Sequence, residues 1–286
     1  MMDEIRVHLE ANPTREDLRH LRAAQRAEDL RAAPLQSYAR AEILIIARDA
    51  SGHLTGGALG MLDAGWLFVD ILWVHPAQRS SGLGTQLMIA LEQEALARGA
   101  EGVYLFTTTF QAVGFYEKLG YKEFARVDER PPGYSTVYYQ KHYIPAQPLP
   151  ELFEVQSPGD PAIVSQLDEA LRAHAETYAP LVIHPLAIYL RDAEDKLCGG
   201  LFGVYFWNWF DIQNLWVLDT LRGQGYGLRL MDALEEALRA AGGVGITAEV
   251  ASYQRMGFFL RAGFEAVGKI DNRPPDYSTY LMRKNL

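Results

Sequence analysis

Two glycine-rich stretches decide how this chain is expected to fold. Residues 73–84 read WVHPAQRSSGLG, and residues 216–227 read WVLDTLRGQGYG. Each follows an apolar stretch typical of a strand and leads into a helical pattern with an apolar residue at every fourth position. Glycines let the backbone approach a ligand closely, and the first turn of a helix has unpaired N–H groups. Both stretches therefore predict an anion-binding loop between a strand and a helix.

The spacing of these stretches indicates a duplicated domain. They lie 143 residues apart, which is half of the 286-residue chain. The same shift aligns the Arg-Pro-Pro of residues 130–132 with that of residues 273–275. A period of this size is that of a domain rather than of a short solenoid repeat. We expect one domain over residues 1–143 and a second over residues 144–286, with the proline-rich residues 145–150 as a stiff linker.

The order of elements in each copy predicts a mixed α/β domain. Copy one opens with a helix whose start is marked by a capping box at Thr14 and Asp17. Strands are expected at residues 43–48, 54–62, 66–74 and 103–107, and two more helices at residues 82–98 and 111–119. We therefore expect two tandem α/β domains, each with a mixed, mostly antiparallel sheet flanked by helices.

Composition limits the kinds of partner. The chain has 27 basic and 36 acidic residues, a formal net charge of −9, which argues against nucleic acid and mildly favours a cationic substrate. A single cysteine, Cys198, excludes an internal disulfide and a multi-cysteine metal site. The histidines show no ligand spacing, so no metal is expected. The first residues do not resemble a signal peptide and no stretch is long and apolar enough to span a membrane, which predicts a cytoplasmic protein without membrane contact.

The residues around the two loops argue against two common phosphate-binding motifs. A P-loop would end in Gly-Lys-Ser or Gly-Lys-Thr, and a dinucleotide-binding fold would carry its loop after the first strand. Here the loop follows the third expected strand, with the spacing Arg-x-x-Gly-x-Gly from Arg79 and again from Arg222. A glycine-rich helix start without any ligand is the structural alternative.

The loop and two later segments resemble the GNAT acetyltransferase superfamily. Arg-x-x-Gly-x-Gly after a strand ending in Trp-Val is similar to that family's acetyl-CoA pyrophosphate loop. Residues 107–121, TTTFQAVGFYEKLGY, are similar to its Phe-Tyr-x-Lys-x-Gly-Phe helix, and the hairpin at residues 131–134 resembles that of small bacterial members. The resemblance covers each copy from about its residue 42 to its end. It implies acetyl-CoA as cosubstrate, bound by Val74, Arg79, Ser80, Ser81, Gly82, Leu83 and Gly84 in copy one and by Val217, Arg222, Gly223, Gln224, Gly225, Tyr226 and Gly227 in copy two.

The resemblance also implies direct transfer of an acetyl group to an amine. Such a transfer needs a route for the amine proton, stabilisation of the oxyanion and an acid for the CoA thiolate. By resemblance, a strand N–H near Val74 serves the oxyanion and Tyr116 is the acid, while Asp70 is a plausible base on the same strand face. Copy two has Gln213 and Phe259 in the places of this aspartate and tyrosine. We expect copy one to carry out the chemistry and copy two to bind CoA without turnover or to act as a scaffold.

Several readings remain open at this stage. The expected activity is acetyl-CoA-dependent N-acetylation of a primary amine on a small molecule or peptide. The rival reading is a catalytically weak acyl-CoA-binding tandem pseudo-enzyme with a structural or sensory role, and a third is an enzyme with two working sites. Because a duplicated chain can mimic a dimer, both a monomer with pseudo-dimeric halves and a homodimer are compatible with the sequence.

Overall fold

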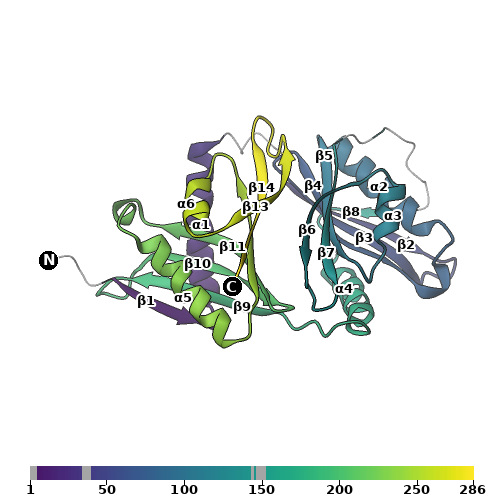
Figure 1. Cartoon of the computed structure of the whole chain (residues 1–286). Coiled ribbons are helices and arrows are strands. Elements are labelled where there is room, and N and C mark those ends of the chain that lie inside the picture. The colour runs from purple at the N-terminus through teal and green to yellow at the C-terminus, as the bar shows by residue number, and fades with distance from the viewer. Residues whose placement is uncertain (1–4, 34–39, 143–144, 146–152) are drawn as a thin grey trace. The chain divides into compact units, whose positions relative to one another are not determined.

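Two mixed sheets with flanking helices form the framework of the protein (Figure 1). The computed structural model describes residues 5–33, 40–142, 145 and 153–286. The strands are β1 (Arg6–Glu10), β2 (Ala41–Arg48), β3 (Leu54–Asp63), β4 (Trp66–Val74), β5 (Gly102–Thr108), β6 (Lys122–Asp128), β7 (Ser135–Lys141), β8 (Glu154–Gln156), β9 (His184–Arg191), β10 (Leu197–Phe206), β11 (Trp209–Val217), β12 (Gly245–Ala251), β13 (Glu265–Asp271) and β14 (Ser278–Asn285). The helices are α1 (Arg15–Ala32), α2 (Leu83–Ala97), α3 (Val113–Lys118), α4 (Pro161–Glu176), α5 (Tyr226–Ala240) and α6 (Met256–Arg261).

The expected α/β fold is confirmed, with differences at particular elements. The Thr14 hydroxyl caps α1 by accepting the Asp17 backbone N–H at 3.1 Å. Helix α3 begins two residues later than expected, because the Gln111 side chain closes a turn by accepting the Thr108 N–H at 3.2 Å. Strand β1 was not expected. Apart from Pro145, the proposed linker lies outside the described residues.

The first strand and helix of each copy pack with the sheet of the other copy. Among the described residues, the two seven-stranded sheets have the orders β1-β9-β10-β11-β12-β14-β13 and β6-β7-β5-β4-β3-β2-β8. Strand β1 of copy one is thus antiparallel to β9, and β8 of copy two is antiparallel to β2. Likewise, α1 lies against β10 and β11, whereas α4 lies against β3 and β4.

Compact packing therefore divides the chain differently from the sequence repeat. One unit, here the α2 unit, comprises Leu35–Leu181 and Ile270–Asp276. The other, here the α5 unit, comprises Met1–Pro34, Val182–Lys269 and Tyr277–Leu286. The division between residues 143 and 144 separates the two copies of the sequence repeat. The compact units differ from the copies because each unit contains the first strand and helix of the other copy.

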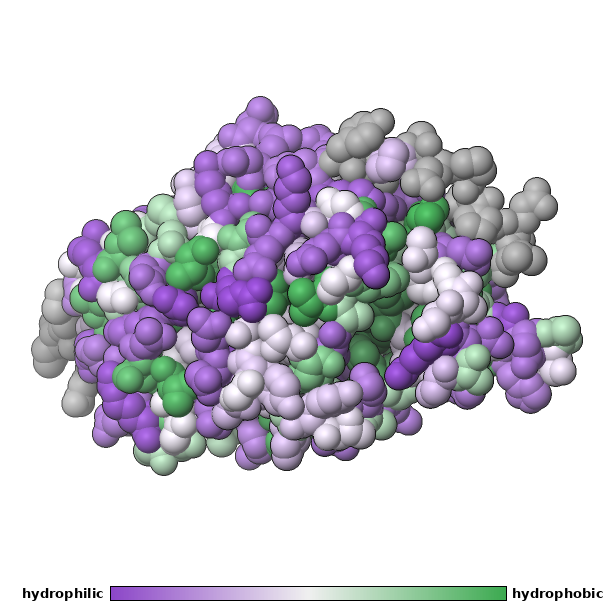
Figure 2. Space-filling view, turned by 45° about the vertical axis from the view of Figure 1, so that its right-hand side comes forward, coloured by the Kyte–Doolittle hydropathy of each residue, from purple (hydrophilic) through white to green (hydrophobic). Residues whose placement is uncertain are grey.

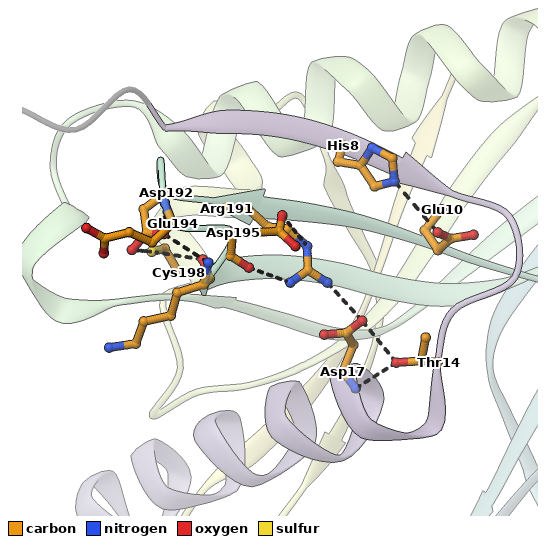
Figure 3. Close-up of polar contacts among 10 residues, drawn as sticks. His8, Glu10, Thr14, Asp17, Arg191, Asp192, Glu194, Asp195 and Cys198 are labelled. Atoms are coloured by element: carbon orange, nitrogen blue, oxygen red, sulfur yellow. Dashed lines mark hydrogen bonds and ion pairs between the residues drawn. The ribbon is translucent and has the colours of Figure 1, made fainter.

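Polar and apolar contacts hold the exchanged helices in place. In the α5 unit, the Arg191 guanidinium of β9 donates to the Asp17 carboxylate at 2.8 Å, as Figure 3 shows. On the same helix as Asp17, Leu21 is fully buried beside Gly200, where an added Cβ would lie 3.5 Å from the Leu21 Cδ1 atom. In the α2 unit, Leu167 of α4 is fully buried in the equivalent place, over Gly57.

Each sheet opens where its two central parallel strands part. Strands β4 and β5 are paired in parallel from Trp66 and Gly102 to Phe68 and Tyr104, and the ladder between the described residues ends there. Just beyond it, Asp70 is the extra residue of a β-bulge, because Ile71 and Val69 pair with consecutive residues of β3. The α5 unit repeats this pattern between β11 and β12, with its bulge at Gln213. A bulge beside an opening turns a side chain toward the space between the strands.

Helix α2 fixes the loop that precedes it by burying an apolar face on the sheet. Leu87, Leu91 and Ala95 of this helix are fully buried in the core of the α2 unit. None of the helices in the described part of the chain combines the length and apolar character needed to cross a bilayer. Hydrophilic side chains predominate on the face that Figure 2 shows, with hydrophobic ones in small groups among them.

Candidate active site

The glycine loop of the α2 unit has the geometry of an anion-binding helix start. Gly82 is the N-cap of α2, with a φ of +89° that favours glycine, and no side chain caps the helix. An added Cβ at Gly82 would meet nothing within 4 Å, so the space over the loop is open. The first-turn N–H groups and the positive end of the helix dipole therefore suit a pyrophosphate at this place.

This loop borders a cavity of about 510 Å³, here the first pocket. The cavity lies where β4 and β5 part, and its lining comes from both strands, the loop, α2, α3 and α4. The lining residues are Val69, Asp70, Leu72, Trp73, Val74, Gln78, Arg79, Ser80, Gly82, Gly84, Thr85, Phe106, Thr107, Phe110, Gln111, Ala112, Phe115, Tyr116, Leu171 and His174. The first pocket thus joins the loop to the two side chains expected to move protons.

Asp70 and Tyr116 both line the first pocket and both hold their protons more tightly than usual. Removal of water around the Asp70 carboxyl raises its pKa above the 3.8 of a free aspartate, and the nearby carboxylates of Asp168 and Glu42 raise it further. Burial alone raises the pKa of the Tyr116 hydroxyl. A carboxylate with a raised pKa is a better proton acceptor, and the phenol of Tyr116, which is half-buried, stays protonated at neutral pH.

The structure brings most of the expected loop residues of copy one to this cavity. Val74, Arg79, Ser80, Gly82 and Gly84 line it. The two others lie beside it: the Ser81 hydroxyl donates to the Gln78 carbonyl oxygen at 2.7 Å, and the Leu83 side chain packs into the core.

An equivalent cavity of about 620 Å³, here the second pocket, lies in the α5 unit. Gly225 begins α5 with a φ of +85° and no side-chain cap, as Gly82 does in the other unit. Of the expected residues of copy two, Val217, Arg222, Gly223, Gly225, Tyr226 and Gly227 line the second pocket, whereas the Gln224 side chain donates to the Thr220 carbonyl oxygen. Gln213 and Phe259 line it in place of the aspartate and tyrosine of the first pocket.

The loop arginines differ in their partners. Arg222 is half-buried, and one terminal nitrogen lies 2.5 Å from the Glu28 carboxylate and 2.8 Å from that of Asp219. Arg79 is exposed and donates from Nε to the Val74 carbonyl oxygen at 3.3 Å. Within the described residues, no hydrogen bond or ion pair engages its terminal nitrogens. The positive charge of Arg79 is therefore available to an anion, whereas that of Arg222 is already neutralised.

The sequence did not reveal that the exchanged helices contribute residues to the two pockets. Leu171 and His174 of α4 line the first pocket, and Gln25 and Glu28 of α1 line the second. Leu167 of α4 and Leu21 of α1 occupy equivalent places in the two units. Seven residues further along each helix, His174 therefore corresponds in position to Glu28. The apolar stripe of each helix predicts that it packs on a sheet, but the stripe alone does not reveal which sheet.

Comparison with known proteins identifies the family. The family model for the acetyltransferase (GNAT) family matches residues 7–121 and matches again at residues 149–264. Since these matches cover most of the chain, the protein belongs to the GNAT acetyltransferase family and is a tandem member of it. In the described part of the chain, no cluster of three or more His, Cys, Asp or Glu side chains could hold a metal ion.

Individual relatives match one domain at a time. The blasticidin-S acetyltransferase of Streptomyces morookaense is 38% identical over 117 residues, which are 41% of this chain and 82% of the relative. An acetyltransferase of Agrobacterium fabrum is 30% identical over 102 residues, 36% of this chain and 74% of the relative. The crystal structure of a Bacillus cereus acetyltransferase is 28% identical with a TM-score of 0.45, and covers 48% of this chain and 97% of that one.

Proposed function

We propose that the protein is an acetyl-CoA-dependent N-acetyltransferase that moves an acetyl group directly to a primary amine in the first pocket. The observation that carries this proposal is the shared lining of that pocket, in which Asp70 and Tyr116 accompany an open glycine loop. Membership of the family supports acetyl transfer as the chemistry. The blasticidin-S acetyltransferase of Streptomyces supports a small-molecule acceptor.

Acetyl-CoA would supply the acetyl thioester, and the residues of the first pocket would hold it. Its pyrophosphate would be bound by the N–H groups of residues 80–84, with Arg79 adding a charged contact. Leu72 and Val74 would line the path of its acyl arm, in the gap where β4 leaves β5. The open space at Gly82 supports this assignment, as do the terminal nitrogens of Arg79, which have no partner in the part of the chain that the structure describes.

The proposed reaction assigns one task to each side chain. The ammonium group of the acceptor first loses one proton to solvent. The neutral amine nitrogen then forms a bond to the acetyl carbonyl carbon while a second proton passes to the Asp70 carboxylate, directly or through water. A backbone N–H near Val74 stabilises the oxyanion. The carbon–sulfur bond then breaks, and the Tyr116 hydroxyl gives its proton to the CoA thiolate. The products are an N-acetylated amine and free CoA, with no acyl-enzyme.

The second pocket is proposed to bind CoA without turnover or to serve as a scaffold. It has the loop residues Val217, Arg222, Gly223, Gln224, Gly225, Tyr226 and Gly227, but glutamine and phenylalanine replace the proposed base and acid. The ion pair between Arg222 and Glu28 weakens the attraction of the second pocket for a pyrophosphate, because the guanidinium is already paired with a carboxylate.

Release of free thiol from acetyl-CoA tests the proposed function. Full-length protein is mixed with acetyl-CoA and a panel of primary amines, and thiol and N-acetylated product are quantified together. The proposal expects thiol release that requires an amine and equals the product formed. Thiol release at the same rate without any amine, or acetyl-CoA binding without release, would instead favour the acyl-CoA-binding pseudo-enzyme.

A further inference from the structure

We propose that the acceptor amine carries a flat, unsaturated ring, which is held in the first pocket by aromatic side chains from both copies. This inference rests on the proposed function and deepens it. Four side chains, here the aromatic wall, carry it: Phe110 and Tyr134 of copy one, and His174 and Tyr178 of copy two. All four belong to the α2 unit.

Tyr178 is the central member of the aromatic wall. Its ring stacks on that of Phe110, with centroids 4.9 Å apart and an interplanar angle of 11°. The rings of His174 and Tyr134 meet it edge to face, at 5.5 Å and 6.5 Å. Tyr134 also meets Phe110 edge to face at 5.1 Å. These offset and edge-on contacts are the geometries that aromatic rings favour, so the wall is ordered before any ligand arrives.

The aromatic wall borders the proposed catalytic groups. Phe110 and His174 line the same cavity as Asp70 and Tyr116. Tyr178 contacts both of these lining rings and is itself 47% exposed. It is therefore a positioning residue that fixes the rings which an acceptor would touch.

The second pocket keeps the hairpin part of this arrangement. Tyr253 and Tyr277 keep an edge-to-face contact at 5.2 Å, as Phe110 and Tyr134 do in the first pocket. Counted from Leu21 and Leu167, Ala32 corresponds to Tyr178, although Ala32 is the last residue of α1 and Tyr178 lies two residues beyond the end of α4. The ring of Tyr178 thus stacks on Phe110, which lines the pocket that also has the proposed base and acid.

The chemistry of the wall selects the acceptor class. A flat ring makes fuller contact with an aromatic side chain such as Phe110 or His174 than a puckered saturated ring of the same size does. Asp70 lines the same pocket, and its carboxylate favours a cationic amine. The carboxylate of Glu42 lies close enough to influence Asp70, whereas that of Asp168 is paired with Arg172 at 2.6 Å. An arylalkyl or heteroarylalkyl amine meets both conditions, with its ring on the aromatic wall and its nitrogen toward Asp70.

A matched pair of amines tests this inference on the full chain. 2-Phenylethylamine and 2-cyclohexylethylamine have the same charge and chain length, and differ in whether the ring is flat. Affinity is measured by calorimetric titration of each amine into protein saturated with CoA, and kcat/KM is measured by thiol release. The wild type is expected to prefer the flat ring by about tenfold, which is the upper end of what aromatic contact contributes.

Variants of Tyr178 then assign the preference to the wall. Tyr178→Ala, which removes the stacked ring, should reduce the preference to about twofold by weakening the flat amine alone. Tyr178→Phe keeps the ring and should keep the preference. Leu260→Ala, at an exposed side chain of α6 that lines neither pocket, is the control and should change nothing.

The two readouts separate failure of the inference from failure of the proposed function. Equal affinity for both amines, or equal weakening of both in Tyr178→Ala, would overturn the aromatic wall as the acceptor site. Ring preference in the titration without thiol release would overturn the proposed chemistry while leaving the acceptor site standing.

Discussion

The first and second pockets share a backbone and differ in the side chains that surround it. Both are bounded by a parting pair of parallel strands, a bulge and a glycine at the start of a helix. In the first pocket the bulge carries Asp70, and the terminal nitrogens of Arg79 have no hydrogen-bond or ion-pair partner among the described residues. In the second pocket the bulge carries Gln213, and Arg222 is paired with Glu28. Duplication has thus preserved the shape of the site more faithfully than its chemistry. The comparison also shows that each pocket is completed by a helix from the other copy.

The largest effect is expected from the leucines that anchor the exchanged helices. Leu167→Ala and Leu21→Ala each remove a fully buried side chain, which costs about 3 kcal/mol of stability. Hydrogen exchange should accelerate in β3 and β4 for the first variant and in β10 and β11 for the second, the strands against which each helix lies. Faster exchange in β3 and β4 after Leu21→Ala would show that the helices are not exchanged.

The second prediction concerns replacing Tyr116 of the first pocket with phenylalanine, the residue that the second pocket has at the corresponding position. Tyr116→Phe removes the proposed acid and should lower kcat by about 100-fold, equivalent to about 2.7 kcal/mol of transition-state stabilisation. Affinity for acetyl-CoA, measured by titration, should change little because the loop is untouched. The mirror variant, Phe259→Tyr, should add no activity, since Gln213 cannot accept a proton. Undiminished kcat in Tyr116→Phe would remove this residue from the mechanism.

The third prediction concerns the pH dependence of kcat/KM when Asp70 of the first pocket is replaced with glutamine, the residue that the second pocket has at the corresponding position. Asp70 acts as a base only when ionised, and its pKa is raised by desolvation and by the carboxylates of Asp168 and Glu42. The wild-type kcat/KM should therefore fall as the pH drops through a value above 3.8. Asp70→Gln should lower kcat/KM by about 30-fold at neutral pH and abolish that acidic limb. An unchanged limb in Asp70→Gln would assign it to another group.

The smallest effect is expected from releasing the arginine of the second pocket. Glu28→Gln removes one of two carboxylates on Arg222 and should tighten CoA binding there by about fivefold. Glu16→Gln, at an exposed position in the first turn of the same helix, serves as the control. Titration with CoA in the Gly82→Glu background isolates the second pocket. Equal affinity in Glu28→Gln and Glu16→Gln would mean that the ion pair does not restrict the loop.

Much of this comparison could be predicted from the sequence, because it depends on local chemistry. The glycine loops and the duplicated strands follow from spacing, and the replacements by Gln213 and Phe259 follow from aligning the copies. The exchange could not be predicted, because duplication provides each first helix with two similar sheets and equally suitable apolar contacts. Strand β1 was missed for a related reason: it is a five-residue edge strand, and its partner lies far along the chain. The sequence therefore did not reveal that His174 lines the first pocket or that Tyr178 packs on its lining rings.

Counting coenzymes by native mass spectrometry tests the central claim, that the first pocket is the site of acetyl-CoA chemistry, most directly. Acetyl-CoA is titrated into the wild type and into Gly82→Glu and Gly225→Glu, which place a carboxylate on the first and the second loop. The account predicts that the tighter-bound coenzyme is lost in Gly82→Glu and retained in Gly225→Glu. Loss of that coenzyme in Gly225→Glu with retention in Gly82→Glu would contradict it.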